Sequence, residues 1–311
     1  MNPLKIDHVL ITRFNVPTPG RERLIRAQEG WLRDRVELFD RYCLPAVESQ
    51  NCQDFSWLVY FDPQSPPWLI DWLQRNETTR RFHTIFRTSI SNSELVADLR
   101  ELTGAGGDVV VTTNLDNDDG ISTDFVARLQ QAVVGTEKKA IYLTRGIILN
   151  DSRTFLHKDR KNAFCSVVEK WDAPLTAWTD WHNRLGLVMP VTELDGPPAW
   201  LQVVHERNVS NTVHGRVVRP SDYASSFPSV LKSLPDPGPF TILVDTMVHR
   251  PVRFLCSAGK TALKSIMLRI LGKDGFDSVK NRVAETGIFL VRPGARRKNA
   301  PPKGKVPESG G

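Results

Sequence analysis

The chain has 311 residues, of which 40% are hydrophobic and 24% charged, an ordinary composition for a globular protein with a sizeable core. No run approaches the roughly 20 apolar residues of a membrane span, the start lacks a secretory apolar region, and the 4 cysteines are scattered, which together favour a cytoplasmic protein with reduced thiols. The net charge of +6 is uneven, because residues 257–311 hold twelve Lys/Arg against four Asp/Glu; this argues against a nucleic-acid groove through the body of the protein.

The first part of the chain predicts strands and helices in alternation. Runs rich in β-branched and aromatic residues indicate strands, and apolar residues at helical spacing indicate helices. In chain order they are a strand at 8–12, a helix at 31–50 with a kink or break at Pro45, a strand at 55–61, a helix opening at 66–73, a short strand at 82–86, a helix at 93–103 and a strand at 108–115. This order predicts an α/β fold with a mainly parallel central sheet flanked by helices.

The second part of the chain is less regular and ends in a basic extension. The predicted elements are a helix near 124–134, a hairpin of 140–149 with 152–157 about Asn150 and Asp151, a strand at 200–205, a basic amphipathic helix at 257–271 and a second helical piece at 274–285. Residues 292–311 are rich in Pro, Gly, Lys and Arg and are predicted to be disordered.

Three aspartates follow the strand at 108–115 directly, in the run Asp116-Asn117-Asp118-Asp119-Gly120. In an open α/β sheet, ligands bind at the carboxyl ends of the strands. Asp116 and Asp118 are two residues apart, so in extended geometry both face the same side, where two carboxylates suit Mg²⁺ or Mn²⁺. A simple polar turn is the alternative. A calcium loop is excluded, because neither register places Gly sixth and Glu twelfth.

Four segments carry a resemblance to a known family. They are HVLITRFN at 8–15, WLVYFD at 57–62, TNLDNDD at 113–119 and WLQVVHERNVSN at 200–211. In this order they resemble the bacterial rhamnosyltransferase family and, more widely, the nucleotide-diphospho-sugar glycosyltransferases of the GT-A fold. The resemblance covers about residues 7–215.

The resemblance implies a domain organisation. A GT-A-like (Rossmann-like) glycosyltransferase domain would occupy 1–256, with a nucleotide-binding half at about 1–135 and an acceptor half at about 136–256. A basic helical extension at 257–291 and a disordered tail at 292–311 would follow.

The resemblance also implies roles for single residues. The metal ligands would be Asp116, Asp118 and His205, and the nucleotide contacts would come from Thr12, Arg13, Asp62, Arg100, Asp116 and Asn208. Simpler roles remain open: Asp62 can cap a turn, Arg100 can lie on a solvated helix face, and His205 can be a packed residue. Asn208 and Asn211 can bind sugar or phosphate, or only cap turns.

An inverting transfer needs a carboxylate that removes the proton of the acceptor hydroxyl. The candidate bases are Glu169, Asp180, Glu193 and Asp195. Asp180 is favoured, because it stands among aromatic residues suited to sugar stacking.

The sequence therefore predicts a glycosyltransferase dependent on Mg²⁺ or Mn²⁺. It would move a sugar, rhamnose by the family resemblance, from a nucleoside diphosphate to a glycan or lipid-linked acceptor. The alternatives are a Mg²⁺-dependent phosphatase or nucleotidyltransferase using the same aspartates, and a non-catalytic nucleotide-sugar-binding protein. The helix at 257–271 either packs on the core or lies at an anionic inner membrane as a peripheral contact.

Overall fold

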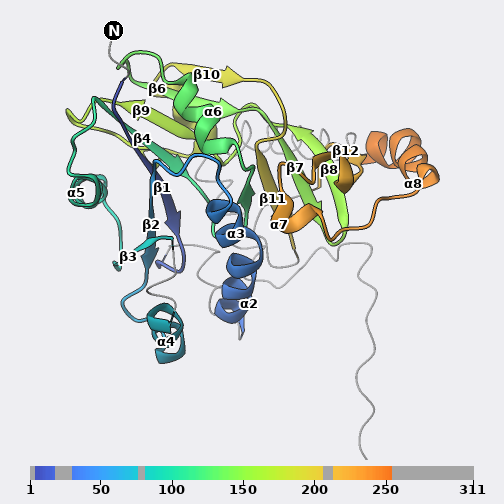
Figure 1. The fold of residues 1–311 in the computed structure, drawn as a ribbon, viewed down its shortest axis with the longest axis horizontal. Helices are drawn as coiled ribbons and strands as arrows, with labels where there is room; N and C mark the ends of the chain where they lie inside the picture. The colour runs from blue at the N-terminus through green and yellow to red at the C-terminus, as the bar shows by residue number, and fades with distance from the viewer. Residues whose placement is uncertain (1–3, 18–29, 76–80, 206–212, 254–311) are drawn as a thin grey trace, which may run out of the picture. The chain divides into compact units, whose positions relative to one another are not determined.

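The computed structural model describes residues 4–17, 30–75, 81–205 and 213–253 (Figure 1). Its elements are β1 Ile6–Arg13, α2 Trp31–Leu38, a π-helical turn Phe39–Cys43, α3 Leu44–Glu48, β2 Ser56–Phe61, α4 Pro67–Arg75, β3 His83–Phe86, α5 Asn92–Thr103, β4 Val109–Asn114, β5 Gly120–Ile121, α6 Phe125–Ala132, β6 Lys139–Leu143, β7 Arg145–Asn150, β8 Arg153–Lys158, β9 Ser166–Glu169, a 3-10 helix His182–Leu187, β10 Val191–Leu194, β11 Trp200–Val204, β12 Arg216–Val218, a 3-10 turn Pro220–Tyr223, α7 Pro228–Leu231, α8 Pro239–Val244 and a second π-helical turn Asp245–His249. The predicted helices at 257–271 and 274–285 and the predicted tail at 292–311 lie outside the described residues.

The larger sheet has seven strands in the order β10-β6-β9-β4-β1-β2-β3. β1 pairs in parallel with β2 and β4, β2 with β3, and β10 with β6, whereas β9 is antiparallel to both of its neighbours. Helices α2 and α3 form the crossover from β1 to β2, and α4 forms that from β2 to β3, whereas β7, β8 and β9 lie between β6 and β10 in the chain. The prediction of an α/β fold with a mainly parallel central sheet flanked by helices is confirmed, with β9 as the exception.

The smaller sheet has five strands in the order β12-β8-β7-β11-β5. The predicted hairpin about Asn150 and Asp151 is confirmed, because β7 and β8 pair antiparallel and Asp151 adopts a φ of 54°, which turn residues tolerate. The prediction of one strand at 140–149 was wrong: β6 and β7 belong to different sheets. The strand is interrupted at Thr144. Its backbone N–H donates to the Leu194 carbonyl, and its carbonyl accepts from the Asp159 backbone N–H.

The predicted kink at Pro45 is confirmed as a change of helix type. Pro45 has no N–H to donate, and its ring would clash with the carbonyl of Arg41 in a regular α-helix. The wider π-helical turn immediately before α3 accommodates this, and it leaves Cys43 fully buried. The Cys43 thiol lies 3.6 Å from the Asp116 carbonyl, so this turn packs directly beneath the aspartate run.

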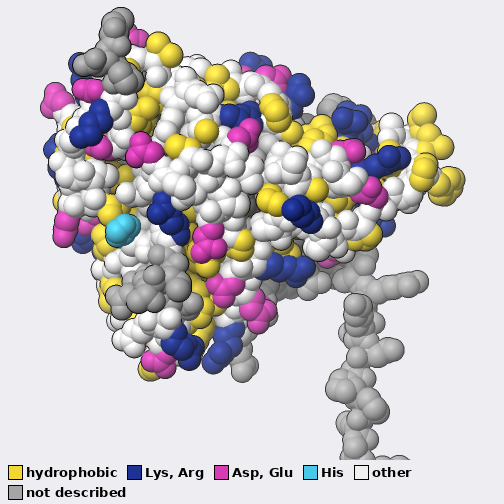
Figure 2. Space-filling model, viewed as in Figure 1, with side chains coloured by type: hydrophobic (Ala, Val, Ile, Leu, Met, Phe, Trp, Pro, Cys, Tyr) yellow, Lys and Arg dark blue, Asp and Glu magenta, His cyan; other side chains and the backbone are white. Residues whose placement is uncertain are grey.

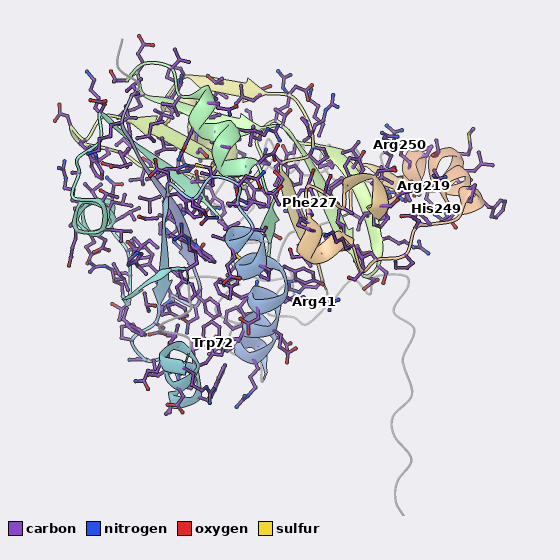
Figure 3. All side chains as sticks on the ribbon, viewed as in Figure 1. Arg41, Trp72, Arg219, Phe227, His249 and Arg250 are labelled. Carbon is purple, nitrogen blue, oxygen red and sulfur yellow. The ribbon has the colours of Figure 1, made fainter. Side chains whose placement is uncertain are left out.

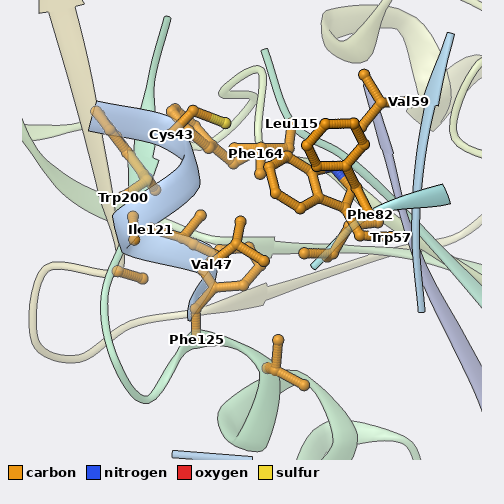
Figure 4. Packing of buried hydrophobic residues seen from close by; sticks show 14 of the residues in the cluster. Cys43, Val47, Trp57, Val59, Phe82, Leu115, Ile121, Phe125, Phe164 and Trp200 are labelled. Atoms are coloured by element: carbon orange, nitrogen blue, oxygen red, sulfur yellow. The ribbon is translucent and has the colours of Figure 1, made fainter. Parts of the chain in front are cut away.

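Aromatic rings fill the core between the helices and the sheets (Figure 4). Trp57 contacts Phe39 and Phe82, with ring centroids 5.4 and 5.3 Å apart. In the smaller sheet Trp200 stacks on Phe164, and a Cβ on Gly146 would come within 2.0 Å of the Trp200 ring. Only glycine fits at that position, because β7 and β11 pair directly there.

Within the described part of the chain, no helix has both the length and the apolar character needed to cross a bilayer.

Candidate active site at the carboxyl edge of the larger sheet

The aspartate run forms a turn that is tied to the end of the neighbouring strand. The Asn117 amide donates to the carbonyl oxygens of Arg13 (3.2 Å) and Phe14 (2.7 Å), at the point where β1 ends. The Asp119 N–H donates back to the Asp116 carbonyl at 3.3 Å. An Asn side chain that imitates a backbone group is a usual way to fix such a turn. The turn therefore holds its carboxyl groups at the carboxyl ends of β1 and β4.

Asp118 lies at the centre of this edge and is buried. Arg35 Nη1 lies 2.6 Å from its Oδ2, and His205 Nε2 lies 3.0 Å from the same oxygen. Arg35 also donates to the Asn117 side-chain oxygen at 3.1 Å. Burial acts to raise the pKa of Asp118, but Arg35 and His205 outweigh it and hold the pKa below its ordinary range. Asp118 is thus a buried carboxylate kept ionised by side-chain partners.

Asp119 has the opposite electrostatics. Burial, together with the neighbouring carboxyl groups of Asp118 and Asp116, raises its pKa well above the ordinary value. Its Oδ1 accepts a hydrogen bond from the Val203 backbone N–H at 2.8 Å, which ties the turn to β11. Two adjacent acids therefore differ in role, since Asp119 joins the two sheets while Asp118 meets Arg35 and His205.

Asp116 is exposed at the rim of the site, beside an aromatic side chain. The Asn114 amide lies 3.4 Å from Asp116 Oδ1, and the Asn114 oxygen accepts from Trp178 Nε1 at 2.7 Å. The Arg13 guanidinium stacks 4.3 Å over the Trp178 ring. An exposed carboxylate, an indole face and a cation therefore meet at the end of β4, a combination suited to a charged ligand with a ring.

Sequence reasoning missed Arg35 and Trp178. Arg35 was assigned only to a helix, although it is the cation on Asp118. Trp178 belongs to the Trp- and Pro-rich segment expected to cover the substrate, and that composition was the available signal. Neither contact follows from local periodicity, because α2 and the segment around Trp178 reach the aspartates only through tertiary packing.

Two of the other predicted nucleotide contacts have structural roles at the same edge. Thr12 is fully buried; its hydroxyl donates to the Leu115 carbonyl at 2.7 Å and accepts from Trp57 Nε1 at 3.0 Å. Asp62 follows β2, and its Oδ1 accepts the Gln64 N–H at 2.8 Å, which closes a turn. Asp62 lies where a nucleotide contact is expected, whereas Thr12 supports the strand end. Both binding roles stay predictions.

Arg100 is not brought to this edge. Its guanidinium donates to the Trp171 carbonyl, and Trp171 Nε1 donates at 2.8 Å to Asp7, which stands at the start of β1. The reason is topological: α5 returns the chain from β3 to the beginning of β4, so the last turn of α5 lies near the amino ends of the strands. This position argues against the predicted nucleotide contact of Arg100.

Glu169 also lies away from the aspartates. It ends β9 opposite Val110, near the start of β4. Its buried carboxylate accepts from the backbone N–H groups of Leu175 (3.0 Å) and Thr176 (2.6 Å), and Lys138 lies 3.3 Å away. This carboxylate holds a loop, and its location argues against a role as the base.

Glu193 and Asp195 lie at the end of β10, three strand spacings of about 4.8 Å each from β4. Glu193 pairs with Arg160, and Asp195 pairs with Arg145 at 2.7 Å and Lys158 at 2.9 Å. The hydrogen bond from Lys158, followed by that from the Gly196 N–H, lowers the pKa of Asp195 to about 2. So low a pKa makes Asp195 a weak base.

Of the four candidate bases, Asp180 is the one that lies close in sequence to a side chain of the site. It stands two residues after Trp178, whose indole reaches Asn114. Asp180 Oδ1 accepts the Trp181 N–H at 2.7 Å, and its Oδ2 lies 3.3 Å from Arg184 Nε. The remaining predicted residues, Asn208 and Asn211, lie outside the described residues.

The predicted metal ligands are brought together in part. Asp118 Oδ2 and His205 Nε2 are 3.0 Å apart and fit two positions of a cation site, and Mg²⁺ usually leaves the others to water and substrate phosphates. Among the residues that the structure describes, no three His, Cys, Asp or Glu side chains converge into a ligand group. A cation at Asp118 would also compete with Arg35 for the same oxygen.

The fold and this edge define an α/β protein with a cluster of acidic side chains at the carboxyl ends of its central strands. A family described as "Putative rhamnosyl transferase" matches residues 7–217, more than half of the chain, so the chain belongs to this family. The resemblance noted in the sequence is thereby confirmed. A search of curated proteins gave no significant match.

Several solved structures are similar at low identity. TarS 1-349 of S. aureus in complex with UDP-GlcNAc has 10% identity and a TM-score of 0.41, over 70% of this chain and 63% of that one. The inositol-1-phosphate CTP transferase of T. maritima has 11% identity and a TM-score of 0.35, over 68% and 93%. The match thus spans less than two thirds of the TarS structure. At these values neither structure informs the activity of this chain.

Proposed function

We propose that this glycosyltransferase-family protein transfers a sugar from a nucleoside-diphosphate donor with the help of a divalent cation. The observation that carries the proposal is Asp118, a buried and ionised carboxylate that faces Arg35 and His205 at the ligand-binding edge of the sheet. Keeping such a group ionised in the interior costs free energy, and functional sites are where such costs are commonly found. The family description supports rhamnose as the sugar.

The side chains at this edge would bind different parts of the donor and its cation. Arg35 and Arg13 would supply positive charge for the diphosphate, and the Trp178 ring, over which the Arg13 guanidinium lies, would border the donor. Asp118 and His205 would hold Mg²⁺ or Mn²⁺, with the other positions left to water and phosphate oxygens; when bound, the cation takes up charge on the leaving diphosphate. The metal site is a proposal that rests on the paired oxygen and nitrogen of Asp118 and His205.

Asp180 is the proposed base. In an inverting transfer the acceptor oxygen forms the new bond to the anomeric carbon, the bond to the phosphate oxygen breaks, and the diphosphate leaves with the electron pair. The Asp180 carboxylate would take the proton of the acceptor hydroxyl. Trp181, which is 73% exposed, lies next to Asp180 and could line the path of a glycan or a lipid-linked sugar.

A two-stage experiment tests this function. Thermal unfolding with a panel of nucleoside-diphosphate sugars, with and without Mn²⁺, should identify a donor that raises the melting temperature only with the cation. With that donor, nucleoside diphosphate should be released only when an acceptor is added. Release of inorganic phosphate would indicate a phosphatase, whereas a nucleotidyltransferase would release pyrophosphate from a nucleoside triphosphate supplied with a sugar 1-phosphate. A donor that binds equally well to Asp118→Asn with chelator present would overturn the proposed metal site.

A further inference from the structure

α8 carries its apolar side chains on the outside. Phe240 is 77% exposed, Leu243 52% and Met247 68%, and these residues are spaced three and four apart, so they lie on one face of the helix. Val248 and Val252, each 53% exposed, continue the apolar surface through the following helical turns. Figure 2 shows these hydrophobic side chains gathered at the end of the molecule formed by α8. We call these five residues the α8 outer face.

The opposite side of the same helix is firmly attached, so the outer face cannot simply turn inward. Asp245 is buried and accepts the Val217 backbone N–H at 3.1 Å, which joins the helix to β12. Arg253 forms two hydrogen bonds to Asp245, at 2.7 and 3.0 Å, and a third to the Gly215 carbonyl at 3.1 Å. Ile242 packs against the main core cluster. The helix is therefore held with its apolar face directed to solvent.

Basic side chains lie beside the same helix (Figure 3). Arg219, His249 and Arg250 are exposed and lie beside α8 (Figure 3). Residues 213–253 hold five Lys/Arg and three Asp/Glu, and one of those acids is the buried Asp245. The excess of basic residues continues in the sequence that follows, because residues 257–311 hold twelve Lys/Arg and four Asp/Glu. Apolar side chains beside an excess of positive charge are the composition of helices that lie in the surface of anionic membranes.

We propose that the α8 outer face is a membrane-docking surface, which inserts its apolar side chains into an anionic lipid bilayer. The charge excess favours lipid over a second copy of the chain, because two such faces would bring like charges together. This inference goes beyond the sugar transfer and does not depend on it. It also differs from the sequence prediction, in which the membrane contact was one of two alternatives for the helix at 257–271.

Vesicle co-sedimentation of the full-length protein tests the docking surface. Wild type should bind vesicles that contain phosphatidylglycerol, should bind far less to pure phosphatidylcholine, and should be released by salt. The triple variant Phe240→Ser, Leu243→Ser, Met247→Ser should lose binding by on the order of tenfold or more, because its apolar insertion is gone. The matched control Val134→Ser, Leu187→Ser changes side chains that are each 75% exposed elsewhere, and it should bind as wild type does.

Four outcomes would overturn the proposal. Absence of wild-type binding at low salt would remove the surface as a membrane contact. Full binding by the triple variant would show that the basic sequence beyond Arg253 suffices alone. Light scattering and thermal unfolding supply the third test: a dimer that the triple variant dissociates would assign the face to a second copy. A lower melting temperature of the triple variant, with its vesicle binding unchanged, would assign the face to residues 254–311 of the same chain.

Discussion

Carboxylates lie at both edges of the larger sheet, but their partners differ. At the amino edge, the half-buried Asp7 accepts from the Gly107 backbone N–H at 2.8 Å and from an indole, and the buried Glu169 accepts from two backbone N–H groups. At the carboxyl edge, the buried Asp118 meets the side chains of Arg35 and His205. A backbone donor cannot leave without unfolding a loop, whereas a side chain can exchange its carboxylate for a ligand. The difference separates carboxylates that hold structure from one available for binding.

The largest expected effect is a loss of turnover on changing the carboxylate at the carboxyl edge. Asp118→Asn keeps the shape but removes the negative charge, so donor turnover should fall by on the order of a hundredfold to a thousandfold. Steady-state kinetics measures this loss, with the donor that the thermal-unfolding screen selects. Glu169→Gln is the matched change at the amino edge, and its turnover per folded molecule should stay near wild type. An equal loss of turnover in both variants would contradict the distinction between a binding carboxylate at the carboxyl edge and a structural one at the amino edge.

The second effect is a loss of stability on removing a carboxylate at the amino edge. Glu169→Ala leaves the N–H groups of Leu175 and Thr176 without their acceptor, and Lys138 without its counter-charge. The free energy of unfolding should fall by about 3 kcal/mol, measured by urea denaturation. Asp172→Ala, an exposed change in the same loop, serves as the control and should cost less than about 0.5 kcal/mol. Equal stability of the two variants would remove the structural role of Glu169.

A third prediction concerns His8, the third residue of β1, which is buried. Burial lowers its pKa from 6.5 to about 3. The folded state therefore favours neutral His8, whose contribution is present above pH 6.5 and is lost as the pH falls toward 3. This group should lower the free energy of unfolding by at most about 1.4 kcal/mol per pH unit in that window.

Urea denaturation from pH 7 to pH 4 measures this slope. His8→Asn should flatten it, because the variant has no imidazole to protonate at this position. Identical slopes for wild type and His8→Asn would show that His8 is not the titrating group.

The smallest expected effect sharpens the role of Arg35. Arg35→Met removes the guanidinium that competes for Asp118 Oδ2, so Mn²⁺ should bind on the order of tenfold more tightly and raise the melting temperature more than in wild type. Arg253→Met is the matched control, because Arg253 pairs with the buried Asp245 beside β12, at the far end of the smaller sheet. Arg253→Met should be less stable, and Mn²⁺ should not rescue it. The same Mn²⁺ response in all three proteins would contradict a cation site at Asp118.

Sequence patterns predicted the long elements well and the short ones poorly. β1, β2 and β4 form runs of buried β-branched and aromatic residues, a signal that local composition carries. β9, β10 and β12 have only three or four residues each and were not predicted. In so short a strand, pairing partners rather than propensity decide the structure. The division of 140–149 between two sheets depends on the hydrogen bonds of Thr144, which no local pattern contains.

By itself, the sequence determined the alternation of strands and helices, the aspartate run after a buried strand, and the family. These are local properties, set by hydrophobic period and by motif order. Only the tertiary structure decided that Arg35 and His205 meet on Asp118, that Arg100 and Glu169 lie at the opposite edge, and that α8 turns its apolar face outward. These outcomes depend on which elements pack together across long stretches of chain, and residue spacing along one element does not specify that packing.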